Sequence, residues 1–549
     1  MPTININRKV FEKVVGRKLP LDKLKDRISY LGTGLESVND DEIVVEVFSS
    51  RPDMLSEQGF ARAFSSFIGT KTGLREYKVN KSSDKVIISK DMKNVRPYTA
   101  CAIVKNLKFD DAKIKEVIQI QEKLHVTYGR NRKKAAIGIY PFEKIKTPIR
   151  FVALKPEEIK FQPLEFPHVI NGRQIISQHP TGREYAHLLE GYEKYPVFID
   201  ANNKVLSMPP IINSHDTGKI TEKTKEVFIE CSGFDFNALS TCLNIIVTAL
   251  ADMGGSIYSM ELHYPDKKVV TPDLKPAEMK LDVAYANKVL GLDLKEAEMV
   301  KLLARMGYGY KNKKVLVPAY RADIMHQRDL VEDVSIAYGF DNFKPEIPNV
   351  ATIAEEDAVE RFRSKVANFL VGFGLVETNN YSLINKDDMG KNMLVDVEPV
   401  ELANSLSSEF NVLRSWIVPS LLGVLKGNKH NEYPQRIFEV GTVFVKDEKT
   451  ETNVAEFLRL GVACCHGRAD YTEVKQILDA LMRALDLKYD IIEAEHGSFI
   501  PGRVGRVVVK GKKVAYIGEI HPQVLSNFDL DTPVACFELN ISELFELLK

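Results

Sequence analysis

Four carboxylates crowd into one short segment of the chain, and they are the first residues whose types and spacing point to chemistry. Three of them stand at positions i, i+3 and i+4 of a predicted helix, which is one face of that helix. Like charges at this spacing repel by roughly 0.2–0.5 kcal/mol per pair, so a cation is expected among them. Ligands made only of oxygen suit a hard ion such as Mg²⁺. The four residues are Asp323, Asp329, Glu332 and Asp333.

A metal is not the only explanation of this acidic cluster. A solvated acidic face that is balanced by neighbouring cations is the commoner outcome for such a pattern. Three candidate cations lie within the same segment, namely Arg321, His326 and Arg328.

A second group of polar residues interrupts apolar strands between residues 195 and 233. Ser207, Glu230 and Ser232 each stand inside a strand-like run, and Pro209-Pro210 is followed by Asn213. Two adjacent prolines stiffen the backbone, so this segment predicts the wall of a pocket. The alternative is an ordinary strand and turn, in which the serines only satisfy nearby backbone groups.

A basic segment with aromatic neighbours is the third candidate. Its cations could neutralise phosphates, and nearby rings could stack on bases, as a surface that touches RNA would require. Charge runs of this length are more often solvated turns. The cations are Arg130, Arg132, Lys133 and Lys134, and the rings are His125, Tyr128 and Tyr140.

The composition bounds the class of protein. The chain has 549 residues, of which 44% are hydrophobic and 27% charged, so three or four globular domains are expected. Lys plus Arg equals Asp plus Glu at 75 each, which leaves only local patches for contact with a polyanion. There is no secretory signal and no apolar run long enough for a membrane helix, so a cytoplasmic protein is expected. The cysteines form no Cys-x-x-Cys pair and are expected to be small buried residues.

Common catalytic motifs are missing. The sequence contains no Walker-type phosphate loop, no strand-linked Gly-x-Gly-x-x-Gly with a suitable acid, no Gly-x-Ser-x-Gly elbow and no His-Glu-x-x-His.

The periodicity of the chain predicts an α+β multidomain protein. Pro52 and Asp53 are expected to open a helix that runs to Ile68, and the proline-rich stretch 264–276 is expected to be a linker. The last ~200 residues predict helices on an antiparallel sheet. The predicted domains are 1–90 (N-terminal α/β), 91–265 (mixed α/β), 271–348 (small and helical, with the acidic cluster) and 350–549.

Several segments together resemble the beta subunit of phenylalanyl-tRNA synthetase in its archaeal and eukaryotic form. They follow the family order over nearly the whole chain, and this collinearity is more specific than any single motif. The segments include Arg51-Pro-Asp-Met-Leu-Ser, Leu124-His-Val-Thr-Tyr-Gly-Arg-Asn-Arg-Lys, Val205-Leu-Ser-Met-Pro-Pro-Ile-Ile-Asn-Ser, Arg321-Ala-Asp-Ile-Met-His and His496-Gly-Ser-Phe-Ile-Pro-Gly-Arg.

The resemblance implies a phenylalanine-tRNA ligase of two alpha and two beta subunits, which uses ATP to attach phenylalanine to tRNA(Phe). The alpha subunit would perform the chemistry. Residues 350–549 would be an inactive copy of the class II synthetase fold, because Phe362-Arg363-Ser-Lys365 and Gly372-Phe-Gly374-Leu-Val-Glu-Thr378 lack the ATP-binding residues of that class. The resemblance also implies a winged-helix-like fold for 271–348, and it assigns Mg²⁺ to the acidic cluster, shared with the alpha subunit.

The resemblance further implies that residues 91–265 hydrolyse tyrosine that has been attached to tRNA(Phe) by mistake. An apolar pocket rejects a substrate with one extra hydroxyl by only about 10²-fold, so a second site that recognises the hydroxyl is useful. Family pocket positions correspond to Phe198, Ser207, Glu230 and Ser232. The family pattern has leucine, aspartate and threonine at the first, third and fourth of these positions. No activated nucleophile is visible, which favours attack by a positioned water.

Two other functions are compatible with the sequence. One is a scaffold subunit whose editing pocket has decayed and which only binds the alpha subunit and tRNA. The other is a freestanding Mg²⁺-dependent phosphotransfer enzyme that is built on the acidic cluster.

Overall fold

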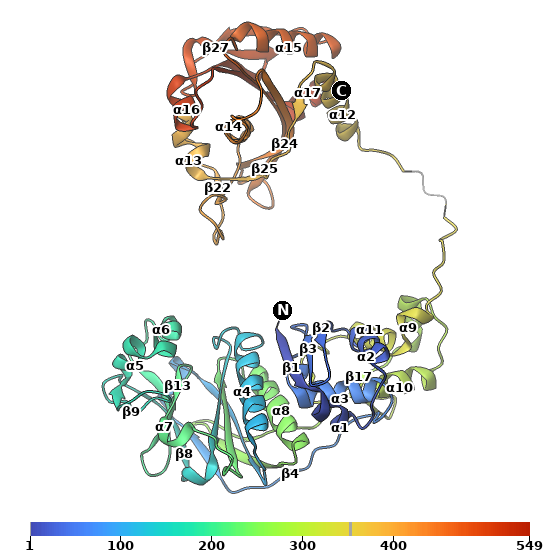
Figure 1. The fold of residues 1–549 in the computed structure, drawn as a ribbon, viewed down its shortest axis with the longest axis vertical. Coiled ribbons are helices and arrows are strands. Elements are labelled where there is room, and N and C mark those ends of the chain that lie inside the picture. Colours follow the sequence, from blue (N-terminus) through green and yellow to red (C-terminus); the bar gives the residue numbers. More distant parts are fainter. Residues whose placement is uncertain (1, 351–353) are drawn as a thin grey trace. The chain divides into compact units, whose positions relative to one another are not determined.

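The structure is a computed structural model that describes residues 2–350 and 354–549. It contains two compact units, Met1–Ile347 and Pro348–Lys549 (Figure 1). Both units mix helices and strands, as the sequence predicts. The further division of the first unit into three domains stays a prediction. In the described ranges none of the helices combines the length and the apolar character that a bilayer crossing requires.

The first unit begins with a small antiparallel sheet that is covered by helices. The aromatic rings of Phe11, Phe60 and Phe64 pack together in its core. The strand order is β1 (Thr3–Asn7), β3 (Glu42–Glu46), β2 (Gly34–Val38), and the helices are α1 (Arg8–Val15), α2 (Leu21–Tyr30) and α3 (Glu57–Phe67).

The prediction that Pro52 and Asp53 open the helix is wrong. Pro52–Met54 form a separate 3-10 turn, and α3 starts after Ser56, whose Oγ accepts a hydrogen bond from the backbone N–H of Gly59. The Asp53 carboxylate cannot act as the cap because both of its oxygens accept hydrogen bonds from Arg51.

An eleven-stranded sheet forms the centre of the first unit. Its main path is β13 (Ile212–Asn213), β12 (Val205–Met208), β11 (Tyr195–Ile199), β8 (Ile149–Leu154), β5 (Lys85–Ile88), β15 (Ser256–His263), β6 (Tyr98–Lys105), β14 (Val227–Gly233) and β7 (Ala135–Pro141). The remaining two strands, β4 (Val79–Asn80) and β16 (Lys268–Thr271), pair with β15. Shorter elements near β11–β13 are β9 (Lys160–Phe161), β10 (Ile170–Asn171), α5 (Gly172–Gln178), α6 (Pro180–Tyr185) and α7 (His215–Gly218).

Side chains of β14 alternate between two cores, which determines where its polar residues point. Ile229 and Cys231 pack into the core that helices α4 (Asp111–Val126) and α8 (Phe236–Asp252) cover (Figure 1). Phe228 belongs to a second core on the opposite face. Because strand side chains alternate with period two, Glu230 and Ser232 share the face of Phe228.

The predicted linker over 264–276 is wrong for residues 268–271. These residues form β16, which pairs with β15, and Thr271 Oγ1 donates a hydrogen bond of 2.6 Å to the carbonyl of Cys101. The prolines suggested a linker, but Pro272 follows directly after the strand. Its missing N–H therefore removes no hydrogen bond between β16 and β15.

The first unit ends in a small helical part with its own sheet. The strand order is β17 (Ala277–Lys280), β19 (Lys314–Val317), β18 (Gly309–Lys311), and the helices are α9 (Val283–Leu290), α10 (Glu296–Arg305) and α11 (Gln327–Tyr338). The acidic cluster lies in α11 and in the loop that leads to it.

The second unit contains the predicted antiparallel sheet, with one parallel strand at its edge. The order is β20 (Val376–Glu377), β24 (Gln435–Lys446), β25 (Val454–Cys465), β29 (Val534–Asn540), β28 (Lys512–Ile520), β27 (Phe499–Val509), β26 (Asp490–Glu493). One face packs against α12 (Ala358–Gly372), α15 (Tyr471–Ala484) and α17 (Ile541–Leu548), and the other against α14 (Val418–Gly427). Shorter elements are β21 (Leu383–Ile384), α13 (Lys386–Met389), β22 (Val400–Glu401), β23 (Val412–Leu413) and α16 (Pro522–Asn527).

The cysteines are buried in both units, as predicted. All six thiols are free, and they are Cys101, Cys231, Cys242, Cys464, Cys465 and Cys536.

Candidate functional site

A cavity of about 120 Å³ lies where β7, β12 and β14 meet helix α4. Ser207 and Glu230, two of the predicted pocket residues, line it, and the predicted wall Pro209-Pro210 and Asn213 line it as well. Pockets that enclose drug-sized ligands measure roughly 300–1,000 Å³, so this cavity can take only one ring or one side chain of a ligand.

Glu230 is a buried carboxyl group that is only partly satisfied. Its side chain is 2% exposed, and Oε1 accepts a hydrogen bond of 3.1 Å from the hydroxyl of Tyr140. Oε2 has no hydrogen-bond partner within the described residues. Burial raises the pKa of Glu230 to about 7, against the opposing effects of the Tyr140 hydroxyl and the positive charge of Arg96. Near neutral pH this group therefore exchanges between its acid and carboxylate forms.

Ser207 presents a second unsatisfied polar atom to the same space. It lies on β12, between Phe198 of β11 and Asn213 of β13 in the sheet register, and is 1% exposed. Its Oγ, like Oε2 of Glu230, finds no hydrogen-bond partner in the part of the chain that the structure describes. A buried polar group without a partner costs about 1–3 kcal/mol, so a ligand or water that bonds both atoms would be favoured.

The other two predicted pocket residues do not line the cavity. Phe198 is fully buried, and its ring stacks on Phe151 with centroids 4.1 Å apart and planes 10° apart. The Ser232 hydroxyl is fully buried and accepts a hydrogen bond of 3.1 Å from Nε of Arg96. Both residues lie in the core beside the cavity, and their part in an editing pocket stays a prediction.

Arg96 is a site residue that sequence reasoning missed. It is 3% exposed, and it ties the basic turn that precedes β7 to β14 through hydrogen bonds to the carbonyls of Arg132 and Ser232. Burial lowers the pKa of Arg96 to about 10, and the nearby Glu230 charge acts in the opposite direction. Nothing in the sequence selects Arg96, because this arginine stands alone before Pro97 and belongs to no motif or periodic pattern.

His125 lines the cavity, but its geometry excludes it as a base. Its Nε2 accepts a hydrogen bond of 2.8 Å from the backbone N–H of Ile137, so the ring proton must sit on Nδ1, 3.3 Å from Oε1 of Glu122. Burial lowers the pKa of His125, which keeps the ring neutral. Its function is to fix the edge of β7 to α4.

Arg132 holds the proline wall in place. Its Nη1 donates to the carbonyls of Ile211 at 2.8 Å and Pro210 at 3.3 Å, and its Nη2 donates to Glu122. The guanidinium also lies 4.4 Å from the ring centroid of Tyr185. Both terminal nitrogens of Arg132 are therefore used inside the protein, while its buried Nε has no partner among the described residues. That Arg132 contacts RNA stays a prediction, which these internal bonds do not favour.

The rest of the basic segment is more open. Arg130 and Lys133 are exposed, in a turn where residues 130, 131 and 132 all have positive φ. Lys134 is half-buried and lies 4.7 Å from the ring centroid of Tyr128. Arg130 and Lys133 are the members of the predicted set that are free to meet a polyanion.

The acidic cluster does not converge on one point. Arg321 donates to both oxygens of Asp323, at 2.8 and 2.7 Å, and its Nη2 also donates to Asp333 at 2.8 Å. Asp329 caps α11, because its Oδ2 accepts from the backbone N–H groups of residues 325 and 326. Glu332 points to solvent.

These residues do not fit a cation site as this chain holds them. Two of the four carboxylates already neutralise one buried arginine, a third satisfies a helix end, and across residues 2–350 and 354–549 no group of three or more His, Cys, Asp or Glu could hold a metal ion. Arg321 balances Asp323 and Asp333, as the alternative proposed, but Asp333 is buried and does not belong to a solvated face.

Comparisons with known proteins agree along the whole chain. Family models match the B3/4 domain at residues 87–242, the tRNA synthetase B5 domain at 279–340 and the phenylalanyl tRNA synthetase beta chain CLM domain at 344–541. The phenylalanine–tRNA ligase beta subunit of Pyrococcus abyssi is 42% identical over 556 residues and covers 100% of both chains. That of Methanococcus aeolicus is 38% identical, covering 98% of this chain and 100% of the relative.

A solved structure supports the same assignment. An N-terminal fragment of the phenylalanyl-tRNA synthetase beta subunit from Pyrococcus horikoshii is 38% identical, with a TM-score of 0.59, and covers 62% of this chain and 100% of the fragment. Full-length identity near 40% together with three matched domains leaves one conclusion. The chain belongs to the family of phenylalanine–tRNA ligase beta subunits and is a subunit of that ligase.

Proposed function

We propose that this subunit checks the product of the ligase by hydrolysing tyrosine that has been attached to tRNA(Phe). The alpha subunit, in a cytoplasmic complex of two alpha and two beta subunits, uses ATP to activate phenylalanine and transfer it. The second unit of this chain acts as a class II synthetase-like body without the ATP-binding residues, and it serves in assembly.

One observation carries this proposal: Ser207 Oγ and Glu230 Oε2 are both buried at one cavity, and neither has a partner among the described residues. A tyrosine side chain has one ring, which matches the size of the cavity, and one hydroxyl, which can bond the two unpaired polar atoms. The carboxylate form of Glu230 accepts the phenol O–H. Phenylalanine leaves both atoms unsatisfied, so it is discriminated against.

The hydrolysis needs no protein nucleophile. A water attacks the ester carbonyl carbon, the bond from that carbon to the ribose oxygen breaks, and the proton lost by the water ends on the ribose hydroxyl. Ser207 orients the water or the ester, while Arg96 and Arg132 keep the cavity walls in position. Arg130 and Lys133 are the proposed contacts to the tRNA backbone.

A magnesium ion at the acidic cluster requires donors that this chain does not supply. Asp329 keeps a second carboxylate oxygen, and Glu332 is exposed, so these two could join donors from the alpha subunit. Such an ion would serve the subunit contact. Metal analysis of the purified complex, with Glu332→Gln against Glu346→Gln as the control, tests this; equal metal content in both variants contradicts it.

The experiment that tests the editing proposal is deacylation of tyrosyl-tRNA(Phe) by the complex of both subunits. Ser207→Ala with Glu230→Ala is expected to slow hydrolysis, whereas the matched exposed pair Ser177→Ala with Glu222→Ala is expected to keep the wild-type rate. An unchanged rate in the pocket variant would favour the scaffold function, in which the chain only binds the alpha subunit and tRNA.

A further inference from the structure

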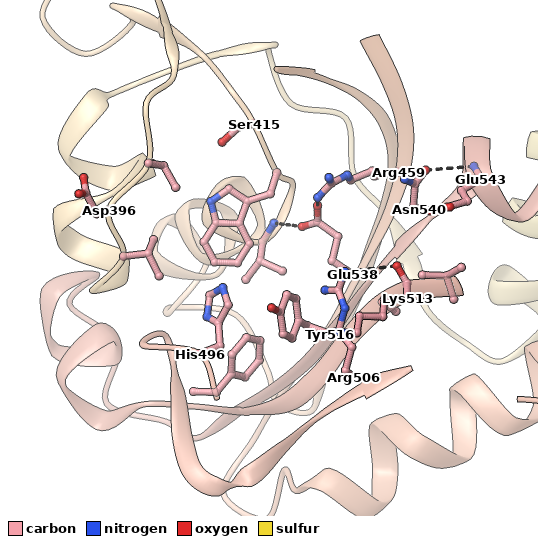
Figure 2. Close-up of a pocket in the computed structure, with 17 residues that line it drawn as sticks. Asp396, Ser415, Arg459, His496, Arg506, Lys513, Tyr516, Glu538, Asn540 and Glu543 are labelled. Atoms are coloured by element: carbon pink, nitrogen blue, oxygen red, sulfur yellow. Dashed lines mark hydrogen bonds and ion pairs between the residues drawn. The ribbon is translucent and has the colours of Figure 1, made fainter. Parts of the chain in front are cut away.

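A second and larger cavity, of about 540 Å³, opens in the unit formed by residues 348–549 (Figure 2). Its floor is formed by strands β25, β27, β28 and β29, and its side by the segment before α14. This volume lies within the range of about 300–1,000 Å³ that is typical of small-molecule sites. Nothing in the proposed editing reaction uses this cavity.

One wall of this cavity is aromatic. The His496 ring lies 5.5 Å from Trp416, 4.8 Å from Tyr516 and 5.2 Å from Phe499, measured between ring centroids. Figure 2 shows His496 and Tyr516 next to each other on this wall. Burial lowers the pKa of His496, so its ring is neutral and adds to a surface on which a planar ring can stack.

The buried acid of this cavity is already saturated. Glu538 accepts hydrogen bonds from the backbone N–H groups of Ile417 at 2.7 Å and Val418 at 3.0 Å, and it pairs with Arg459 at 3.0 Å. Because these three donors occupy both oxygens of the carboxylate, Glu538 has little capacity left for a cationic ligand.

The remaining lining charges are two positive, Arg506 and Lys513, and two negative, Asp396 and Glu543, and they differ in how they are paired. Arg506 lies 3.9 Å from the ring centroid of Tyr516 and donates to the carbonyl of Lys513. The charge of Glu543 acts on it from a distance, but Arg506 forms no salt bridge within the described ranges. Lys513 is exposed and also lines the cavity. Glu543 is paired with a lysine outside the lining, and Asp396 is exposed at the rim. A half-buried guanidinium without a salt bridge favours an anionic ligand.

We propose that this cavity binds a small molecule that carries both a planar aromatic ring and an anionic group. The ring stacks against Trp416 and His496, and the anionic group meets Arg506 and Lys513. A nucleotide and an aromatic carboxylate share this chemistry.

The chain offers a built-in reporter for the test, because Trp416 is its only tryptophan. Fluorescence of the full chain, excited selectively at tryptophan, is titrated with AMP and separately with phenylacetate. At least one of them is expected to give a saturable change, and the one that does identifies the source. Adenosine and inorganic phosphate, which each lack one half of the ligand, are expected to bind at least about tenfold more weakly.

Variants separate the site from general effects on the fold. Arg506→Gln and, independently, the exposed Lys513→Gln are expected to weaken binding of the responding probe, by roughly tenfold or more for Arg506. Arg503→Gln, on the same strand but outside the cavity lining, is the matched control and is expected to bind as the wild type does. Absence of a saturable response to both probes at millimolar concentration would overturn the proposal, and so would equal binding in Lys513→Gln and Arg503→Gln.

Discussion

Replacing Glu230 by glutamine is expected to change the stability of the first unit in a way that depends on pH. The folded protein raises the pKa of this carboxyl from its ordinary value of 4.5 to about 7 because the group is buried. Between these two pH values the folded state holds a proton that the unfolded state has released. Stability is therefore lost as the pH rises through this window, by about 3 kcal/mol in all.

Glutamine has nearly the same shape as glutamate and carries no charge, so the free energy of unfolding of the variant does not fall in this pH window. Near pH 4.5 the variant and the wild type are expected to be similar, and at pH 8 the variant is expected to be more stable by about 3 kcal/mol. Hydrogen exchange of peptides that contain β14, measured on both proteins at each pH, reports the local free energy of opening. Glu222→Gln, at an exposed position, serves as the control. An equal difference between variant and wild type at both pH values would refute the buried, proton-holding state of Glu230.

Three further outcomes are expected. Phe198→Ala removes a ring stacked in the core and is expected to destabilise the first unit by about 3–5 kcal/mol, seen as a lower thermal midpoint; an unchanged midpoint would argue against a core position. Arg321→Gln leaves the buried Asp333 and the partly buried Asp323 without their cation and is expected to cost about 3–5 kcal/mol, while the exposed Arg328→Gln changes stability little; similar midpoints for both variants would contradict the ion-pair assignment. The chain without its alpha partner is expected to show no phenylalanine-dependent pyrophosphate exchange, and clear exchange would defeat the proposed division of labour.

The fold was largely predictable from periodicity, and the errors have local causes. The pattern of the last ~200 residues predicted helices on an antiparallel sheet, and the second unit has this arrangement. The segment 268–271 was misread because prolines on both sides look like a linker, although pairing with β15 only needs the N–H groups between them. The start of α3 was misread because Asp53 resembles a cap, whereas its carboxylate is bound by Arg51.

The residues of the candidate site could be predicted only where a short segment of sequence singles them out, as a polar residue within an apolar strand does. Ser207 and Glu230 were found because each is a polar residue in an apolar strand, and both reach the cavity. The direction of the Phe198 side chain could not be predicted, because the register of β11 with its neighbours decides that it faces Phe151. The internal bonds of Arg132 could not be predicted because its carbonyl acceptors lie about 80 residues away in sequence. Contacts of that kind exist only in the folded chain.

The account depends most directly on what happens to tyrosine in the working ligase. The complete alpha–beta complex should be supplied with tRNA(Phe), ATP and tyrosine, and the tyrosyl-tRNA(Phe) that accumulates should be measured for wild-type enzyme and for the Ser207→Ala, Glu230→Ala variant. The account predicts little accumulation with the wild type and a clear rise with the variant, at an unchanged rate of phenylalanine attachment. Equal accumulation in both enzymes would contradict it.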